Sequence, residues 1–371
     1  MAHVPIPNNR VQQQHVVWSL DPPSRHVRLR RGGVTSWPVQ EGVFELGNLE
    51  VERGGVIRGA RLAWQTHGTL NAERDNVIVY PTSYTATHDG QSWAVGPDMV
   101  LDPENYFIVI PDMFSNGLSS GAANTPDYPE VVTVRDNVLA QARLLEEVFG
   151  VRDIAAVYGF SMGAMQAYHW AALFPDRVER AVVVCGSART AMHNRVFLSG
   201  LLRTLEAAPE YLGHGQFSAE PVAALKAFGH IYAGWGLSQD FYRAELFRTV
   251  LGAPDLETYL KADWEAGFAR CHAADLYAQA LTWTHGDISA NDLYGGDLPR
   301  ALAAIRARVL LMPGETDLYF RVADNAAELS HLKAGELKPI PGIWGHRAGS
   351  PAGLPAELAF VKAAVQECLA T

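Results

Sequence analysis

The sequence has few cysteines, and this scarcity excludes two common kinds of small-protein architecture. Its three cysteines, Cys185, Cys271 and Cys368, lie far apart in a chain of 371 residues. An odd number of widely spaced cysteines provides neither a disulfide framework nor the paired cysteines of a zinc knuckle. We therefore expect no structural metal, and a reducing, cytoplasmic compartment.

Long apolar runs and a surplus of positive charge are also missing. No apolar run approaches the roughly 18 residues of a membrane-spanning helix, and the first residues lack the apolar stretch of a signal peptide. The 30 Lys and Arg against 40 Asp and Glu give a net charge of −10, whereas phosphate binding needs a basic face. The best basic stretch, residues 25–31 (RHVRLRR), favours a solvated turn. We expect neither a nucleic acid nor a membrane as partner.

What the chain does contain is typical of a globular protein, with 48% hydrophobic and 19% charged residues. Its length allows one large domain or two. Residues 1–45 lack periodicity and are predicted to form an irregular N-terminal arm. Residues 47–54 and 56–68 read as extended stretches around a Gly-Gly turn, which predicts an antiparallel hairpin.

Short apolar runs then alternate with helical patterns. Continuous apolar runs are typical of parallel strands covered on both faces. The clearest helical patterns span residues 134–149 and the stretch from after Ser161 to about residue 174. This alternation predicts a mostly parallel, doubly wound sheet of the α/β class. The apolar runs lie at residues 76–80, 106–110, 154–158, 181–185, 308–312 and 336–340.

The strand signal stops between residues 186 and 300, a span that is rich in aromatic residues and mostly helical in pattern. A long helical insertion between two parts of one sheet is typical of a lid over an active site. We therefore predict a core of residues 46–185 and 301–371, with residues 186–300 as a helical lid.

The strongest local motif is Gly-Phe-Ser-Met-Gly at residues 159–163, between a predicted strand and a predicted helix. That context is typical of a nucleophile elbow, in which a sharp turn presents the Ser161 hydroxyl above the sheet edge. Small residues are needed on both sides of the turn, and the helix N-terminus favours developing negative charge. A chance match is conceivable in a chain with 33 glycines, but the flanking strand and helix favour function.

A serine hydroxyl is a weak nucleophile and needs a base and an orienting acid. Asp317 and His346 each follow one of the two strands predicted after the lid, which gives the chain order serine, acid, histidine of such sites. Because carboxyl ends of parallel strands share one edge of the sheet, we expect Ser161, Asp317 and His346 to meet as catalytic residues. Glu315 and Asp324 are the alternatives to Asp317.

Two N–H groups are needed to stabilise an oxyanion. The backbone N–H of Met162, directly after the serine, is one candidate. The loop after the strand at residues 76–80 should supply the other, with Ser83 preferred and Thr82 second, although a simple polar turn would explain either residue.

Several longer segments carry a family resemblance. The matching segments are residues 105–110, 115–121, 133–150, 159–170 and 256–276. Together they resemble the homoserine O-acetyltransferase branch of the α/β-hydrolase superfamily, from about Gly47 to the C-terminus. The resemblance implies an α/β-hydrolase fold with a lid after the sixth core strand, a triad of Ser161, Asp317 and His346, acyl-enzyme chemistry, and a lid that often mediates dimerisation.

The substrate loops depart from that family's pattern. Residues 81–85 read Pro-Thr-Ser-Tyr-Thr instead of His-Ala-Leu-Thr-Gly, which makes Thr82 and Tyr84 candidate substrate contacts. Leu198 stands where the family has an arginine that holds a carboxylate, with Arg195 or Arg189 as possible substitutes. This loss favours a carboxylic-ester hydrolase over an O-acetyltransferase that moves an acetyl group from acetyl-CoA to homoserine or serine.

Two other classes are open to test. A non-catalytic binding protein of this fold would typically lack a triad residue, whereas all three are present. A metal site built from His272, His285, Asp275 and Asp287 matches no known ligand spacing. We expect no cofactor, a small-molecule ester or acyl-CoA as the partner, and a homodimer through the lid.

Overall fold

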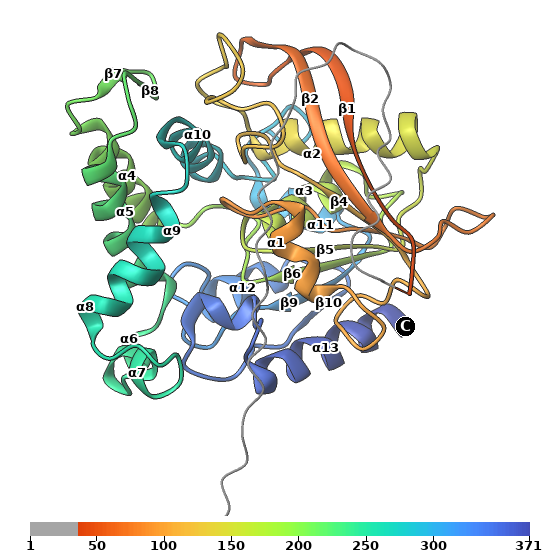
Figure 1. Cartoon of the computed structure of the whole chain (residues 1–371). Helices are drawn as coiled ribbons and strands as arrows, with labels where there is room; N and C mark the ends of the chain where they lie inside the picture. The colour runs from red at the N-terminus through yellow and green to blue at the C-terminus, as the bar shows by residue number, and fades with distance from the viewer. Residues whose placement is uncertain (1–35) are drawn as a thin grey trace, which may run out of the picture.

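A sheet of eight strands runs through residues 36–371, the part of the chain that the computed structural model describes (Figure 1). The strands are β1 (Val39–Glu50), β2 (Val56–His67), β3 (Val77–Val79), β4 (Phe107–Pro111), β5 (Ala156–Phe160), β6 (Arg180–Val184), β9 (Arg308–Met312) and β10 (Gly335–Leu337). Their order is β1-β2-β4-β3-β5-β6-β9-β10. β2 pairs antiparallel with β1 and β4, and the other pairs are parallel, which confirms the predicted α/β sheet.

The N-terminal hairpin begins earlier than the sequence predicted. β1 starts at Val39, where it pairs with His67, so the expectation of an irregular arm through residue 45 is wrong for its last residues. β1 is an edge strand with only partial burial, and it therefore lacks a continuous apolar run. Gly42 lets the Trp64 ring approach, because a Cβ there would lie 2.6 Å from that ring. The rest of the arm, with the basic stretch 25–31, lies outside the described residues.

Helices cover both faces of the sheet, which explains the continuous apolar runs. The covering helices are α2 (Val134–Leu144), α3 (Met162–Leu173), α11 (Leu298–Ala304) and α13 (Pro355–Ala370). In β3, Val77 and Val79 pack in one core cluster with residues of α2, α3 and α11. Ile78 points to the opposite face and packs in a second cluster with residues of α13. α2 begins with a capping box formed by Thr133 and Asp136, and it continues as one π-helical segment to Phe149.

The insertion after β6 forms a helical layer beside the sheet (Figure 1). Its elements are α4 (Met192–Glu206), β7 (Tyr211–Gly213), β8 (Gln216–Phe217), α5 (Val222–Gly236), α6 (Gln239–Arg243), α7 (Leu246–Thr249), α8 (Leu256–Tyr259), α9 (Ala266–Phe268) and α10 (Ala273–Thr284). The chain enters and leaves this layer through two paired segments, which we call the neck. The N–H of Thr190 donates to the Gly286 carbonyl, and the N–H of Ile288 donates to the Ala188 carbonyl.

Packing beyond the neck places the end of the insertion before residue 300. The Tyr294 hydroxyl donates to the Ala172 carbonyl at 2.6 Å, and Ala301 and Leu302 of α11 share the core cluster of α3. We therefore propose that the lid comprises residues 191–286. A helical pattern alone could not separate α11 from the lid, because both are amphipathic. No helix among residues 36–371 has the length and apolarity needed to cross a membrane.

Candidate active site

Ser161 stands on a sharp turn between β5 and α3. Its φ of 56° and ψ of −122° are strained for a residue with a side chain. A Cβ at Gly159 would lie 2.1 Å from the Gly163 carbonyl oxygen, and a Cβ at Gly163 would lie 2.6 Å from the Pro81 carbonyl oxygen. Both flanking positions therefore require glycine because backbone approaches them closely.

Ser161, His346 and Asp317 form one hydrogen-bonded line. His346 Nε2 lies 2.9 Å from Ser161 Oγ, and His346 Nδ1 lies 2.7 Å from Asp317 Oδ2. The other carboxylate oxygen accepts from the N–H groups of Tyr319 and Phe320 at 2.7 and 3.3 Å. When Nδ1 donates its proton to this carboxylate, Nε2 is left to accept the proton of the serine hydroxyl.

The two alternative acids do not reach the histidine. Glu315 is exposed, and its carboxylate accepts from the Gly342 N–H at 3.4 Å. Asp324 is exposed in the first turn of α12 (Val322–Leu329). The structure thus places Asp317, and neither rival, beside His346.

The free N–H groups near the elbow differ in part from the sequence expectation. The Met162 N–H has no acceptor among residues 36–371, as an oxyanion donor requires. The Ser83 N–H, however, already donates to Gln91 Oε1 at 3.1 Å, and the Thr82 N–H donates to the Pro111 carbonyl at 3.2 Å. The N–H of Tyr84 has no acceptor in the described chain, so it is the uncommitted donor of this loop.

A line of buried amide side chains, which sequence reasoning missed, ties this loop to the elbow helix. Trp170 Nε1 donates to Gln141 Oε1 at 2.9 Å, and Gln141 Nε2 donates to Gln166 Oε1 at 2.6 Å. Gln166 Nε2 then donates to the Thr82 carbonyl at 2.9 Å. The only sequence signal was that Met165 and Gln166 lie in the segment 159–170, which carries the family resemblance. This line fixes the distance between Ser161 on α3 and the loop after β3.

Replacing Gln166 with leucine should lower kcat about tenfold with little change in KM. The substitution removes the bond to the Thr82 carbonyl, and a displaced oxyanion donor weakens transition-state binding more than substrate binding. Steady-state kinetics with a small carboxylic ester would measure both constants. Trp170→Phe, which removes only the far one of the three hydrogen bonds in this line, is the control and should have a smaller effect on kcat. A lower melting temperature with an unchanged kcat would show that the line is merely structural.

Aromatic rings enclose the histidine. The ring centroids of Phe160, Tyr319 and Phe320 lie 4.7, 5.0 and 5.6 Å from that of His346. Ser161 is only 3% exposed and His346 8%. The lid rings that contact Tyr319 are Phe197, Tyr232, Trp235 and Trp283. Such a wall excludes water and favours a small, apolar group next to the serine.

The two predicted substrate contacts in the loop after β3, Thr82 and Tyr84, are engaged in different ways. Thr82 is engaged by the protein itself, since its hydroxyl accepts from the Met113 N–H at 2.8 Å and its carbonyl accepts from Gln166. Tyr84 forms part of the wall, because its ring stacks on Tyr232 at 5.8 Å. Its hydroxyl also donates to the Leu276 carbonyl at 2.8 Å.

Neither Leu198 nor Arg189 is available as a clamp for a substrate carboxylate. Leu198 is completely buried in the apolar cluster that contains Met162. Arg189 is held at the neck by Asp287 Oδ2 at 2.6 Å and by other neck groups. Arg195 lies on α4, and its buried Nε has no hydrogen-bond partner in the described chain.

α4 also buries an amide that the sequence analysis overlooked. Asn194 is 1% exposed, and neither its amide oxygen nor its nitrogen has a partner among residues 36–371. It shares the buried face of α4 with Phe197 and Leu198. Trp283 Nε1 is likewise buried and unpaired. A polar residue in an otherwise apolar helical stripe was the available signal, and such orphaned groups are candidates for substrate hydrogen bonds.

The structure does not assemble the alternative metal ligands, His272, His285, Asp275 and Asp287, into one group. His272 pairs with Glu220 at 2.8 Å, and Asp275 accepts from the Ala123 N–H. Asp287 instead binds the neck arginine. Burial raises the pKa of Asp275 to about 6.

Cys185 lies beside the hydrogen-bonded line. Within residues 36–371, the one group of three potential metal-ligating side chains is Cys185, Asp317 and His346. Burial, followed by the negative charge of Asp317, raises the pKa of the Cys185 thiol well above its usual range. Asp317 and His346 already bind each other, and His346 also binds Ser161 Oγ, so this group fits the serine site better than a metal.

Comparisons with known proteins agree with this geometry. A family model described as the alpha/beta hydrolase fold matches residues 77–346. A protein named as a probable esterase of Corynebacterium glutamicum is 39% identical, over 81% of this chain and 88% of its own length. An ethyl acetate hydrolase of Pseudomonas veronii is 34% identical, over 82% and 89%.

More distant relatives and a solved structure extend the comparison. A homoserine O-succinyltransferase of Methylibium petroleiphilum is 30% identical, over 73% of this chain and 78% of its own. The crystal structure of an acetylester hydrolase from Corynebacterium glutamicum superposes with a TM-score of 0.84 at 35% identity, over 89% of this chain and 96% of the other. The chain belongs to the α/β-hydrolase superfamily, in the branch of serine esterases and homoserine O-acyltransferases, as a member that departs from the homoserine enzymes.

Proposed function

We propose that this protein hydrolyses small acetate esters through an acyl-enzyme formed on Ser161. The observation that carries the proposal is the line of hydrogen bonds from Ser161 Oγ through His346 to Asp317, at 2.9 and 2.7 Å. The aromatic wall around His346 supports a small acyl group, and the relatives named as esterase and ethyl acetate hydrolase support the same chemistry.

In the proposed reaction, His346 Nε2 takes the hydroxyl proton as Ser161 Oγ attacks the ester carbonyl. The Met162 N–H and a donor from the loop after β3 hold the oxyanion. For that second donor, the uncommitted N–H of Tyr84 is favoured over that of Ser83, which would have to release Gln91. His346 returns the proton to the departing alcohol, and water then attacks the acyl-enzyme with His346 again as base.

Hydrolysis is favoured over acetyl transfer because Leu198 stands where the family has its carboxylate-holding arginine. Leu198 is apolar and buried, and Arg189 is engaged at the neck. The experiment compares ethyl acetate hydrolysis with acetyl-CoA consumption, each with and without homoserine or serine. We expect acetate release from ethyl acetate that no amino acid accelerates. Formation of an O-acetyl amino acid from acetyl-CoA at a faster rate would instead support the transferase.

The same proposal includes a homodimer through the lid and a cytoplasmic location. Met192 and Val196, one turn apart on α4, are 74% and 67% exposed, which supports an interface there. Sedimentation equilibrium of the purified protein would test it, and a monomer at micromolar concentration would contradict it. The cytoplasmic location rests on the sequence argument that the cysteines do not form a disulfide framework.

A further inference from the structure

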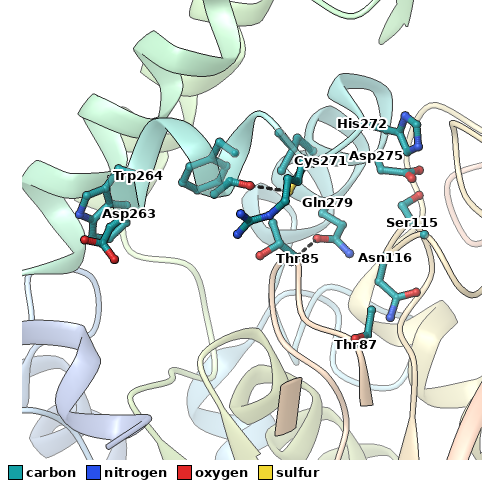
Figure 2. Close-up of a pocket in the computed structure, with 15 residues that line it drawn as sticks. Thr85, Thr87, Ser115, Asn116, Asp263, Trp264, Cys271, His272, Asp275 and Gln279 are labelled. Carbon is teal, nitrogen blue, oxygen red and sulfur yellow. Dashed lines mark hydrogen bonds between the residues drawn. The ribbon is translucent and has the colours of Figure 1, made fainter. Parts of the chain in front are cut away.

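The buried triad needs a route by which an ester can reach it. A cavity of about 530 Å³ lies where the lid meets the core (Figure 2). Its lid side is formed by residues of α9, α10 and the segment before α9, including Trp264 and Phe268. Its core side is formed by the loops after β3 and β4, including Thr85 and Asn116. The cavity lining does not include Ser161 or His346.

Two tyrosines separate this cavity from the triad. The Tyr232 ring lies 5.0 Å from Phe268 and 6.2 Å from Trp264, both of which line the cavity. On its other side, Tyr232 contacts Tyr319 at 5.8 Å, and Tyr319 contacts His346. Tyr84 stacks on Tyr232. One layer of stacked rings therefore stands between the cavity and the ring next to the catalytic histidine.

The cavity chemistry differs from that of the aromatic wall. Thr85, Thr87 and Arg270 line it, and their side chains have no hydrogen-bond partner among residues 36–371. Trp264 and Phe268 add flat apolar surface. Unpaired donors and acceptors beside aromatic rings suit a ligand that carries several hydroxyl groups on a carbon skeleton.

The charges of the lining argue against a phosphate-bearing ligand. Arg270 is the fixed cation among the lining residues, and it shares the cavity with the carboxylates of Asp263 and Asp275. His272, the remaining basic side chain, is engaged by Glu220. A di- or triphosphate would be repelled by these two carboxylates and attracted by a single arginine. A neutral polyol, by contrast, can donate to the carboxylates and accept from Arg270.

We propose that this cavity binds the alcohol portion of the ester, that this portion is a neutral polyol or sugar, and that Tyr84 and Tyr232 form the gate between it and Ser161. The inference rests on the proposed ester hydrolysis and names its substrate class. In the productive complex the acetyl group lies inside the aromatic wall, and the hydroxylated part lies among Trp264, Arg270 and the two threonines.

The test compares two acetate esters of the same shape. Glycerol 1-monoacetate and 2-methylbutyl acetate share one skeleton and differ only in two hydroxyls against two methyl groups. We expect kcat/KM to favour the glycerol ester by about tenfold, which corresponds to one net hydrogen bond. This preference should fall to near unity in Arg270→Met. Lys261→Met removes an exposed cation that does not line the cavity, and it should keep the wild-type preference.

The gate is tested with a bulkier ester. Tyr232→Ala removes the ring and should raise kcat/KM for 2-naphthyl acetate relative to ethyl acetate by about tenfold, whereas Tyr232→Phe retains the ring and should keep the wild-type ratio. Melting temperatures establish that each variant is folded. If Tyr232→Ala does not fold, Tyr232→Leu, which also removes the ring, takes its place.

Several outcomes would overturn the inference. The first is an equal kcat/KM for the glycerol and methylbutyl esters in the wild type. The second is an Arg270→Met variant in which kcat/KM falls equally for both esters. The third is an unchanged ratio of kcat/KM for 2-naphthyl acetate to that for ethyl acetate in the Tyr232 variant without a ring. Ethyl acetate hydrolysis and labelling of Ser161 are measured on the same preparations. Loss of those in the wild type would contradict the proposed function itself, whereas their retention without the polyol preference would contradict only the role of the cavity.

Discussion

Replacing Ser161 with alanine should lower kcat for ethyl acetate by about five to six orders of magnitude. The reaction as proposed passes through an ester on Ser161 Oγ, and no other hydroxyl stands at 2.9 Å from His346 Nε2 among the described hydrogen bonds. Removal of the nucleophile from a serine triad leaves only the contribution of the oxyanion site and of substrate binding. Acetate release over hours, with enzyme in large amount, would measure the residual rate.

Covalent labelling separates this loss from simple unfolding. A fluorophosphonate should label the wild type on Ser161 and leave Ser161→Ala unlabelled. Ser330→Ala, which alters an exposed serine at the end of α12, should label and hydrolyse as the wild type does. Labelling that persists in Ser161→Ala would move the nucleophile elsewhere. A folded wild type that neither labels nor hydrolyses would support the alternative of a non-catalytic binding protein.

The hydrogen-bonded arrangement of the proposed triad could be predicted because each of its residues follows a strand predicted from the sequence. β5 and β9 lie on apolar runs, β10 pairs beside β9, and parallel strands place their carboxyl ends at one edge. Position in the chain therefore implied position in space for Ser161, Asp317 and His346. The glycines around Ser161 added a backbone requirement that only a sharp turn imposes.

Side-chain pairing across elements could not be predicted in the same way. The N–H of Ser83 was expected to be free, but it donates to the side-chain oxygen of Gln91, eight residues later. The Gln141–Gln166 bond joins α2 to α3, and nothing local in either helix indicates its partner. The choice of Arg189 or Arg195 as a clamp also depended on how the neck folds, since Asp287 and Arg189 are almost a hundred residues apart in the chain.

The proposed acyl and alcohol sides of the site differ in the side chains that line them, and this difference should shape substrate selectivity. Around His346 the wall is aromatic, so the acyl side of the ester is limited mainly by size. Beyond Tyr84 and Tyr232, the cavity that we propose for the alcohol portion combines threonine side chains and one arginine with apolar rings, so hydrogen bonding adds to size in selecting the alcohol. A substrate that combines a small acyl group with a hydroxylated alcohol satisfies both, whereas a long acyl chain would collide with the rings.

Replacing Asp317 with asparagine should lower kcat about ten-thousandfold at neutral pH, with KM nearly unchanged. Asp317 Oδ2 accepts the His346 Nδ1 proton at 2.7 Å, and its other oxygen is held by the N–H groups of Tyr319 and Phe320. Because these N–H groups claim the amide oxygen, the NH₂ of asparagine would face Nδ1. The histidine must then carry its proton on Nε2, where it points at Ser161 Oγ and cannot accept the hydroxyl proton.

Glu315→Gln is the matched control, because it neutralises the rival acid two residues earlier in the same loop. Glu315 is exposed, and its carboxylate accepts from the Gly342 N–H, so the variant should hydrolyse ethyl acetate at the wild-type rate. Steady-state kinetics of both variants, with fluorophosphonate labelling rates as a second readout, decide the assignment. A large loss in Glu315→Gln together with a small one in Asp317→Asn would reverse the roles of the two acids. Comparable small losses in both would mean that His346 is oriented by the surrounding rings instead of by a carboxylate.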